Sequence, residues 1–411
     1  MRVWIPIVVL AALAAAPLQA AVGGGPDDIA PSVDELIAIA LAHAPEIPVL
    51  EAKKRASHER EESADALPDP MLGLTAQGMG LTPPGPASSI VVDVSQELPF
   101  PGKRAARRAA TEAETNVRAA EVGDQKRRIA AQVRILYARI YGLDQERQKR
   151  ISTRDILDLL SRTLAARYST GQVDRTGLLR IQLESARVDE RMIELEGDRA
   201  ELVASLNRLL GRAANTPLGR IPSLPPAGPL GDGLDASALG ASSELEVLRA
   251  EAAAAEKRVD ETRLEEKPDF SIGLGGGVDG MAEPVVMLRF GVGLPLWRGK
   301  KQVPLTRAAE QDLAAAKGEI RATEADVRTR VAALKAAWRR DEALIALYTD
   351  TIIPQSRAMF EAAQAAYLAD RGDFSSVIEG YEALLDSEVE VARREAARFE
   401  TWALLEQLVK P

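Results

Sequence analysis

Cysteine is absent from this 411-residue chain, and aromatic residues make up only 4% of it. Without cysteine the chain has no disulfides, thiolate metal sites, cysteine nucleophiles or lipid carried on a leading cysteine. Only two histidines occur, His43 and His58, so one chain cannot build a histidine-rich zinc or copper site. We interpret both as surface or packing residues. Few aromatics and much alanine favour long helices packed through small side chains.

Basic residues are also too few to give a positive surface. The 52 lysines and arginines face 61 aspartates and glutamates, a net charge of −9, which argues against a nucleic-acid partner because binding phosphates requires a basic excess. The glycine-rich stretches 273–277 and 293–300 lack the spacing of nucleotide-binding loops. No catalytic triad or paired-carboxylate site stands out. We expect no enzyme activity, no catalytic residue, no metal site and no cofactor.

The first twenty residues have the pattern of a secretory signal peptide. Arg2 supplies the positive start, residues 3–16 form an apolar run, and Leu18-Gln19-Ala20 places a small residue at a cleavage site. The run is shorter than the roughly 20 residues of a membrane-spanning helix, and no other segment is long and apolar enough. We expect the chain to be exported.

Helical and strand periodicities alternate along residues 21–210. Ser32-Val33-Asp34-Glu35 has the pattern of a capping box and precedes a helical run. Alternating apolar residues then predict strands at about 71–79 and 89–98. A helical hairpin is predicted over about 103–210, interrupted at Gly171. Its returning arm has apolar residues every three or four positions, which is typical of a coiled coil.

The same order of elements then repeats. A linker rich in proline and glycine covers 211–240, and residues 241–411 contain predicted strands at about 269–278 and 285–294 and a helical hairpin at about 300–409. We expect Pro354 to break the outgoing arm of this hairpin. Pro268-Asp269 repeats Pro68-Asp69. The chain is therefore interpreted as a tandem duplication with a period of about 200 residues.

The dimensions of these elements suit a membrane and a wide compartment beside it. Strands of about 9–10 residues cross an outer membrane when tilted, and their alternation separates a lipid face from a lumen face. Four strands cannot close a barrel, and lipid does not tolerate open edges, so several copies must assemble. The outgoing helical arm would reach about 100 Å. The residues expected to face lipid are Leu72, Leu74, Ile90, Val92, Val94, Phe270, Ile272, Leu274, Leu288, Phe290 and Val292.

The chain resembles the TolC-like outer-membrane efflux proteins over nearly its whole mature length. The resemblance depends on Ala44-Pro45-Glu46, Leu67-Pro68-Asp69-Pro70, residues 96–103, and Tyr168 with Gly171 before a leucine-rich helix. It implies a mixed α and β, mostly α, membrane protein. In the implied homotrimer, a twelve-stranded β-barrel in the cell outer membrane continues as a twelve-helix coiled-coil α-barrel into the periplasm, with the linker in an equatorial region. Pro99-Phe100-Pro101-Gly102 is similar to the heavy-metal efflux branch, the CzcC/CusC-like proteins.

The resemblance implies a passive exit duct for small solutes, heavy-metal cations among them. Its implied partners are two further copies of the chain, outer-membrane lipid, a periplasmic adaptor protein and a proton-driven inner-membrane pump. Two alternatives stay open from the residues alone. One is an outer-membrane duct for protein secretion, and the other is an exported, soluble coiled-coil scaffold without a barrel.

The resemblance also assigns the hairpin tips a role, because in this family they close the resting duct and dock the adaptor. The glycine at each tip is expected to end a long helix in the left-handed backbone region. The aspartate that follows either caps the returning helix or forms, in three copies, a negative ring that attracts cations, and both roles can coexist. The candidate tip residues are Gly171, Asp174, Gly372, Asp373, Phe374 and Glu379.

Overall fold

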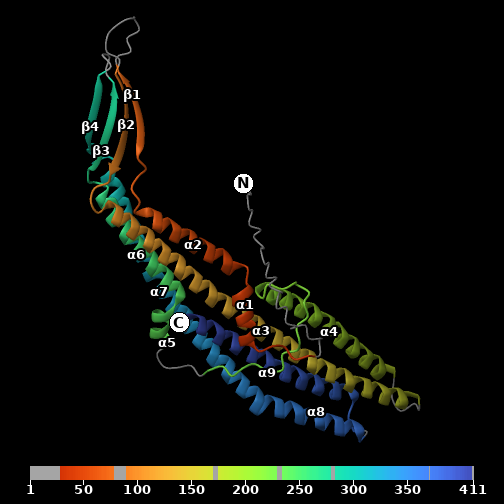
Figure 1. Ribbon diagram of the computed structural model, residues 1–411. Coiled ribbons are helices and arrows are strands. Elements are labelled where there is room, and N and C mark those ends of the chain that lie inside the picture. Colours follow the sequence, from red (N-terminus) through yellow and green to blue (C-terminus); the bar gives the residue numbers. More distant parts are fainter. Residues whose placement is uncertain are drawn as a thin grey trace, which may run out of the picture.

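The computed structural model describes residues 28–77, 89–169, 175–228, 234–278, 283–369 and 371–409, and the predicted signal segment lies outside this part. The molecule is elongated, with a four-stranded sheet at one end and helical hairpins running away from it (Figure 1). In the described part, no helix has the length and apolar character that crossing a membrane requires.

The elements follow the repeated order that the sequence predicts. The first set consists of α1 (Val33–His43), α2 (Glu46–Ala64), β1 (Met71–Gln77), β2 (Ser89–Leu98), α3 (Lys103–Ser169) and α4 (Arg175–Leu209). The second consists of α5 (Leu234–Ala241), α6 (Ser243–Leu264), β3 (Asp269–Val278), β4 (Pro284–Gly293), α7 (Gln302–Leu347), η1 (Tyr348–Ile352), α8 (Ile353–Leu368) and α9 (Phe374–Val409).

The four strands form one antiparallel sheet in the order β1-β2-β3-β4. The central pairing joins the two repeats, since Val94 of β2 lies opposite Leu274 of β3. The outer strands β1 and β4 each have one neighbour within the chain, so each leaves one edge unpaired. Unpaired edges would be exposed to lipid in a membrane, which the bilayer does not tolerate. A sheet placed in a membrane would therefore have to be part of a larger closed structure.

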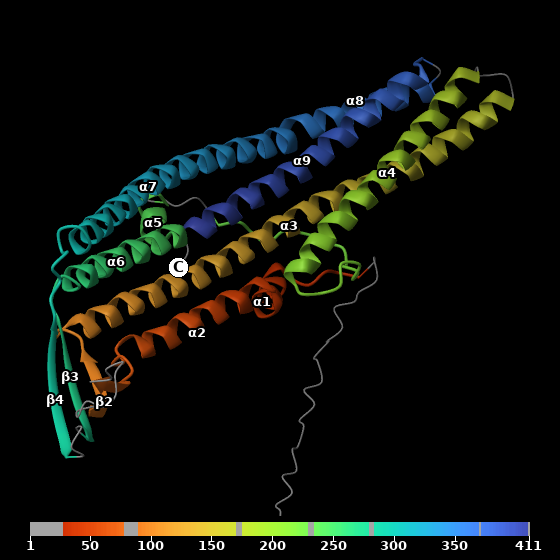
Figure 2. The same ribbon diagram turned by 90° about the horizontal axis from the view of Figure 1, so that it is seen from above.

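Two helical arms of equal length lead away from the sheet. α3 has 67 residues, which corresponds to about 100 Å. The run α7-η1-α8 has the same number of residues and extends in the same direction (Figure 2). α4 and α9 return from the far end as helices of 35 and 36 residues. The duplication therefore produces two hairpins of matching size.

The expected break at Pro354 is wrong. Instead of ending, the helix widens into the π-helical turn η1, and Pro354 lies in the first turn of α8. Proline lacks an N–H and its ring crowds the carbonyl four residues earlier. The wider π-turn relieves this conflict locally and lets the arm continue.

The predicted seam of α4 faces the protein. Ile181, Val188 and Leu195 are buried, and the residues around them on the other faces are mostly exposed. The charged seam residue Arg199 donates to the buried carboxylate of Asp144 at 2.7 Å, and also to two backbone carbonyls. These acceptors explain why a charge is tolerated on an otherwise apolar seam.

The spacing of three and four residues also predicts an apolar seam for α9, and the structure agrees with it in part. Val377, Tyr381, Leu384 and Leu405 are buried as predicted, but in the middle of the helix buried residues such as Ala392 and Phe399 lie one position after the predicted ones. This drift follows because α9 contacts α3, α7 and α8, so most of its surface is covered. A single narrow stripe cannot describe such a helix.

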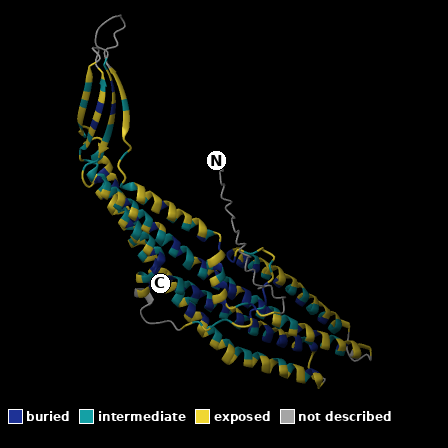
Figure 3. Cartoon of the chain, in the orientation of Figure 1, coloured by how far each residue is buried: buried dark blue, intermediate teal, exposed yellow. Residues whose placement is uncertain are grey.

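The main hydrophobic core lies at mid-length, where α1, α3, α4, α9 and the segment after α4 meet. Figure 3 shows that the buried residues concentrate there, away from the sheet. The capping box at the start of α1 is confirmed, since Ser32 Oγ accepts from the Glu35 N–H and Glu35 Oε2 accepts from the Ser32 N–H. Part of the predicted linker packs on this core, because the Ile221 N–H donates to Asp144 at 2.9 Å.

Candidate functional site

The sheet separates its side chains into two faces of opposite character. All eleven residues predicted to face lipid lie on one face and are exposed in the single chain. One row crosses all four strands, from Leu72 to Val94, Leu274 and Leu288. An exposed apolar patch of this extent marks an interaction surface. Its contact with lipid stays a prediction, which the Leu288→Arg variant would test.

The opposite face is mostly polar or small, and an ion pair lies near its middle. Asp93 of β2 is buried, and its Oδ2 lies 3.7 Å from Nη1 of Arg289 on β4. Gly275 of β3 lies opposite Asp93, and a side chain there would collide with Asp93 Cβ at 2.8 Å. Gly73 is equally tight, since an added Cβ would come within 2.8 Å of Asp93 Oδ1. Glycines therefore make room for this charge on the inner face.

The second hairpin tip is held by Asp373. Its Oδ1 accepts from the Ser376 N–H at 2.8 Å and from the Ser376 hydroxyl at 2.7 Å, at the start of α9. These two hydrogen bonds lower the pKa of Asp373 below its ordinary value. Asp373 is therefore a helix cap that stays ionised at neutral pH. Its carboxylate is also exposed, so capping does not prevent it from contributing to a ring of charge.

The left-handed backbone expected at Gly372 is not present. Positive φ values occur at Gly102, after β2, and at Gly211, after α4, but not at Gly372. Gly372 lies in a tight place instead, because an added Cβ would be 3.0 Å from the Ala366 Cβ and 3.3 Å from its carbonyl carbon. The tip folds back closely onto the end of α8. Gly171 and Asp174 of the first tip lie outside the described residues.

The two other predicted tip residues differ in their surroundings. Phe374 is buried, and its ring packs edge-on against Tyr367 with centroids 5.5 Å apart. Glu379 is exposed and accepts from Arg180 Nη2 of α4 at 3.3 Å. Arg180 also donates through Nη1 to the Ser375 hydroxyl at 2.7 Å. Arg180 thus joins the returning helices of the two hairpins near their tips.

A second link between the returning helices was not predicted. Burial raises the pKa of Glu382 on α9, and its neighbour Glu184 on α4 raises it further through charge repulsion and a shared hydrogen bond. Two carboxyl groups that share a proton attract each other, and two ionised ones repel. Both groups line a cavity of about 210 Å³ together with Arg187 and Tyr381.

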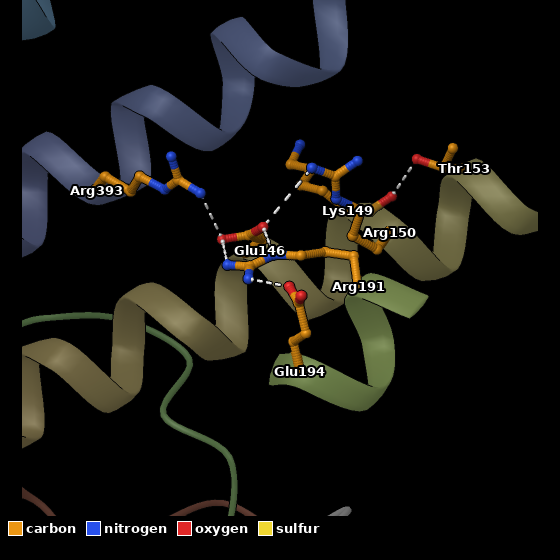
Figure 4. Close-up of polar contacts among 7 residues, drawn as sticks. All are labelled: Glu146, Lys149, Arg150, Thr153, Arg191, Glu194 and Arg393. Carbon is orange, nitrogen blue, oxygen red and sulfur yellow. Dashed lines mark hydrogen bonds and ion pairs between the residues drawn. The ribbon is translucent and has the colours of Figure 1, made fainter. Parts of the chain in front are cut away.

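Deeper in the hairpins, Glu146 of α3 connects three helices (Figure 4). Its carboxylate accepts from Arg191 of α4 at 2.8 and 3.2 Å and from Arg393 of α9 at 2.9 Å. Burial acts to raise the pKa of Glu146, but the two arginines outweigh it and the pKa is lowered. The sequence gives no local signal for this link, because Arg393 lies 247 residues away.

In the described part of the chain, no three carboxylate or histidine side chains come close enough together to hold a metal ion. His58 lies on the exposed side of α2 beside Glu61 and Glu62. The candidate functional regions are thus the apolar face of the sheet and the distant tips.

Comparison with known proteins agrees with this arrangement. Residues 36–212 match the family model described as outer membrane efflux protein. The outer membrane protein VceC from Vibrio cholerae is 18% identical, with 92% of this chain and 95% of VceC covered at a TM-score of 0.76. The outer-membrane channel OprN is 15% identical, with 94% of each chain covered at 0.80. CusC, whose structures concern folding and transmembrane channel formation, is 14% identical, with 92% of each chain covered at 0.75. A search of curated proteins gives no match.

At these identities the solved structures show the fold alone, and this chain, with its four-stranded sheet and long helices, has the fold of these outer-membrane proteins. The family match covers residues 36–212, which include most of α1, all of α2 to α4 and the first two strands. The resemblance to the TolC-like proteins is confirmed.

Proposed function

We propose that three copies of this chain form a passive duct that carries small solutes, heavy-metal cations among them, out of the periplasm. A periplasmic adaptor protein would dock at the tips, and a proton-driven pump in the inner membrane would supply the energy. The observation that carries this proposal is the separation of two specialised ends by a 67-residue helix, about 100 Å long. One end has an apolar outer face, and the other carries exposed charge.

The heavy-metal cargo is supported by Pro99-Phe100-Pro101-Gly102, where Gly102 has the positive φ of 99° that the turn before α3 requires. Deleting the gene should lower the tolerance of the cells to cations such as zinc or cobalt, and unchanged tolerance would contradict this cargo.

We propose further that the tips form both the gate and the docking surface. Gly171, Asp174, Gly372, Asp373 and Glu379 would line or shape the closed end, while buried Phe374 would fix the position of α9. The support comes from the second tip, where exposed Asp373 and Glu379 lie within six residues of each other at the start of α9. Three such tips around one axis would create a negative ring that favours cations.

Replacing both tip aspartates tests this proposal. Asp373→Ala combined with Asp174→Ala should raise single-channel conductance in planar bilayers, because the start of α9 loses its cap, and should reduce the preference for cations. Asp260→Ala with Asp326→Ala is a matched control that removes two exposed charges from α6 and α7. The control should leave both quantities unchanged. Unaltered conductance and selectivity in the tip variant would limit those aspartates to helix capping.

A further inference from the structure

Two turns that lead from a strand into a long helix are copies of one motif, yet their surroundings differ. The first contains Leu98-Pro99-Phe100 and Gly102-Lys103, and the second contains Leu294-Pro295-Leu296 and Gly299-Lys300. The side chain of Lys103 in the first turn is only 3% exposed. In the second turn Leu296 and Trp297 are 79% and 73% exposed. The second copy therefore lacks a covering surface within its own chain.

The first turn is covered by the second repeat. Lys103 Nζ donates to Asp269 Oδ2 at 2.8 Å and to Glu265 Oε2 at 3.3 Å. The Phe100 N–H donates to the other oxygen of Asp269 at 2.8 Å, and its ring stacks on that of Phe270. Asp269 begins β3, and Glu265 lies just after α6. This joint forms because β2 pairs with β3, which brings α3 beside α6.

The matching charged groups at the two outer edges of the sheet have no ion pair in the described part of the chain. Lys300 and Lys301 of the second turn are exposed and have no ion pair among the described residues. Asp69, which stands in Pro68-Asp69 as Asp269 stands in Pro268-Asp269, is exposed and also has no ion pair in the described part. Asp69 precedes β1 and Lys300 follows β4, at opposite edges of the sheet. Three strand spacings, about 14 Å, separate these edges, so the two groups cannot meet within one chain.

We propose that the Lys300-Lys301 turn of one chain binds Asp69 of the next chain in the trimer. The joint between subunits would thereby repeat the joint between the two repeats. Closing the barrel pairs β4 with the β1 of the next copy, which places α7 beside that copy's α2 as α3 lies beside α6. The charges are complementary, and Arg298 of the same turn is already paired with Glu266. This inference rests on the trimer of the proposed function.

Because the chain has no cysteine, any disulfide that forms must join the introduced cysteines. Asp69→Cys combined with Lys300→Cys introduces the two cysteines at exposed positions that are too far apart for an intrachain disulfide. After oxidation, we expect covalent dimers and trimers on a non-reducing denaturing gel, which collapse to monomers on reduction. Asp69→Cys with Lys301→Cys tests the neighbouring register, because the second turn is one residue longer than the first.

Two matched controls show where a disulfide forms. Lys103→Cys with Asp269→Cys should cross-link within one chain and give no dimers or trimers. Lys53→Cys with Lys300→Cys should give none either, since Lys53 lies 11 residues before the end of α2, about 17 Å further from the sheet.

Charge exchange provides the second measurement. Asp69→Lys alone, and Lys300→Asp with Lys301→Asp alone, should lower the temperature at which the trimer dissociates, and combining all three should restore it. If the parent forms a trimer but neither cysteine pair cross-links and the charge variants have no effect, the proposed contact is overturned and the proposed duct is not. A parent that forms no trimer would overturn both.

Discussion

Leu288→Arg is the sharpest test of which sheet face contacts lipid. Leu288 is the fifth of ten residues in β4 and lies opposite Leu274 in the apolar row that crosses the sheet. An arginine near the midplane of an outer-membrane barrel costs about 2–4 kcal/mol. Three well-separated copies in a trimer would add up to about 6–12 kcal/mol, which is comparable to the whole stability of many folded domains.

The assay is the amount of heat-dissociable trimer in the outer-membrane fraction, compared between the parent and the variant at equal expression. Met287→Arg is the matched control, because Met287 is adjacent on the same strand and points to the inner face opposite Gly275. That face already carries Arg289, so the control should cost about 0–1 kcal/mol. If the Leu288→Arg variant forms a normal amount of trimer and the Met287→Arg variant forms none, the two faces are assigned the wrong way round.

Two further predictions concern the helices. Met192 packs against the cluster of Leu157, Ile181 and Val188, so Met192→Asp should destabilise the first hairpin by about 2–4 kcal/mol, measured by thermal unfolding, because it places an unpaired charge there; an unchanged midpoint would place this face in solvent. Because the folded pKa of Glu382 is raised, its carboxyl takes up a proton on folding, and the parent should gain stability as pH falls from neutral through that pKa towards the ordinary value of 4.5. Glu382→Gln should be more stable than the parent at neutral pH and should lose this pH dependence, whereas an identical pH profile would exclude Glu382 as its source.

Features that depend on local periodicity could be predicted from the sequence. The alternation around Leu72, Val94 and Leu288 predicted both the strands and their common face, because the side-chain direction in a strand reverses at every residue. The cap at Asp373 was also predictable, since it depends on a residue three positions away. The middle of α9 was not, because several helices pack against α9 and its buried residues there leave the predicted stripe.

Features that depend on distant or compensating contacts could not be predicted. Arg180 finds its partners 195 and 199 residues further along the chain, and one sequence shows no sign of that pairing. Pro354 was expected to end a helix because its local cost is high, but the π-turn before it removes that cost. Gly372 has a structural role, but the close approach of Ala366 rather than its φ explains it.

The equal lengths of α3 and the run α7-η1-α8 restrict how this architecture can change in evolution. Both arms begin beside the sheet and must end at a common level if their tips are to meet one partner. An insertion in one arm shifts its tip by 1.5 Å per residue and rotates its apolar seam by about 100°. Only a change of about seven residues, made in both arms and in both returning helices, keeps the seams facing inward and the tips level. Chains with this pair of hairpins should therefore lengthen or shorten in matched steps of one heptad, with the sheet unchanged.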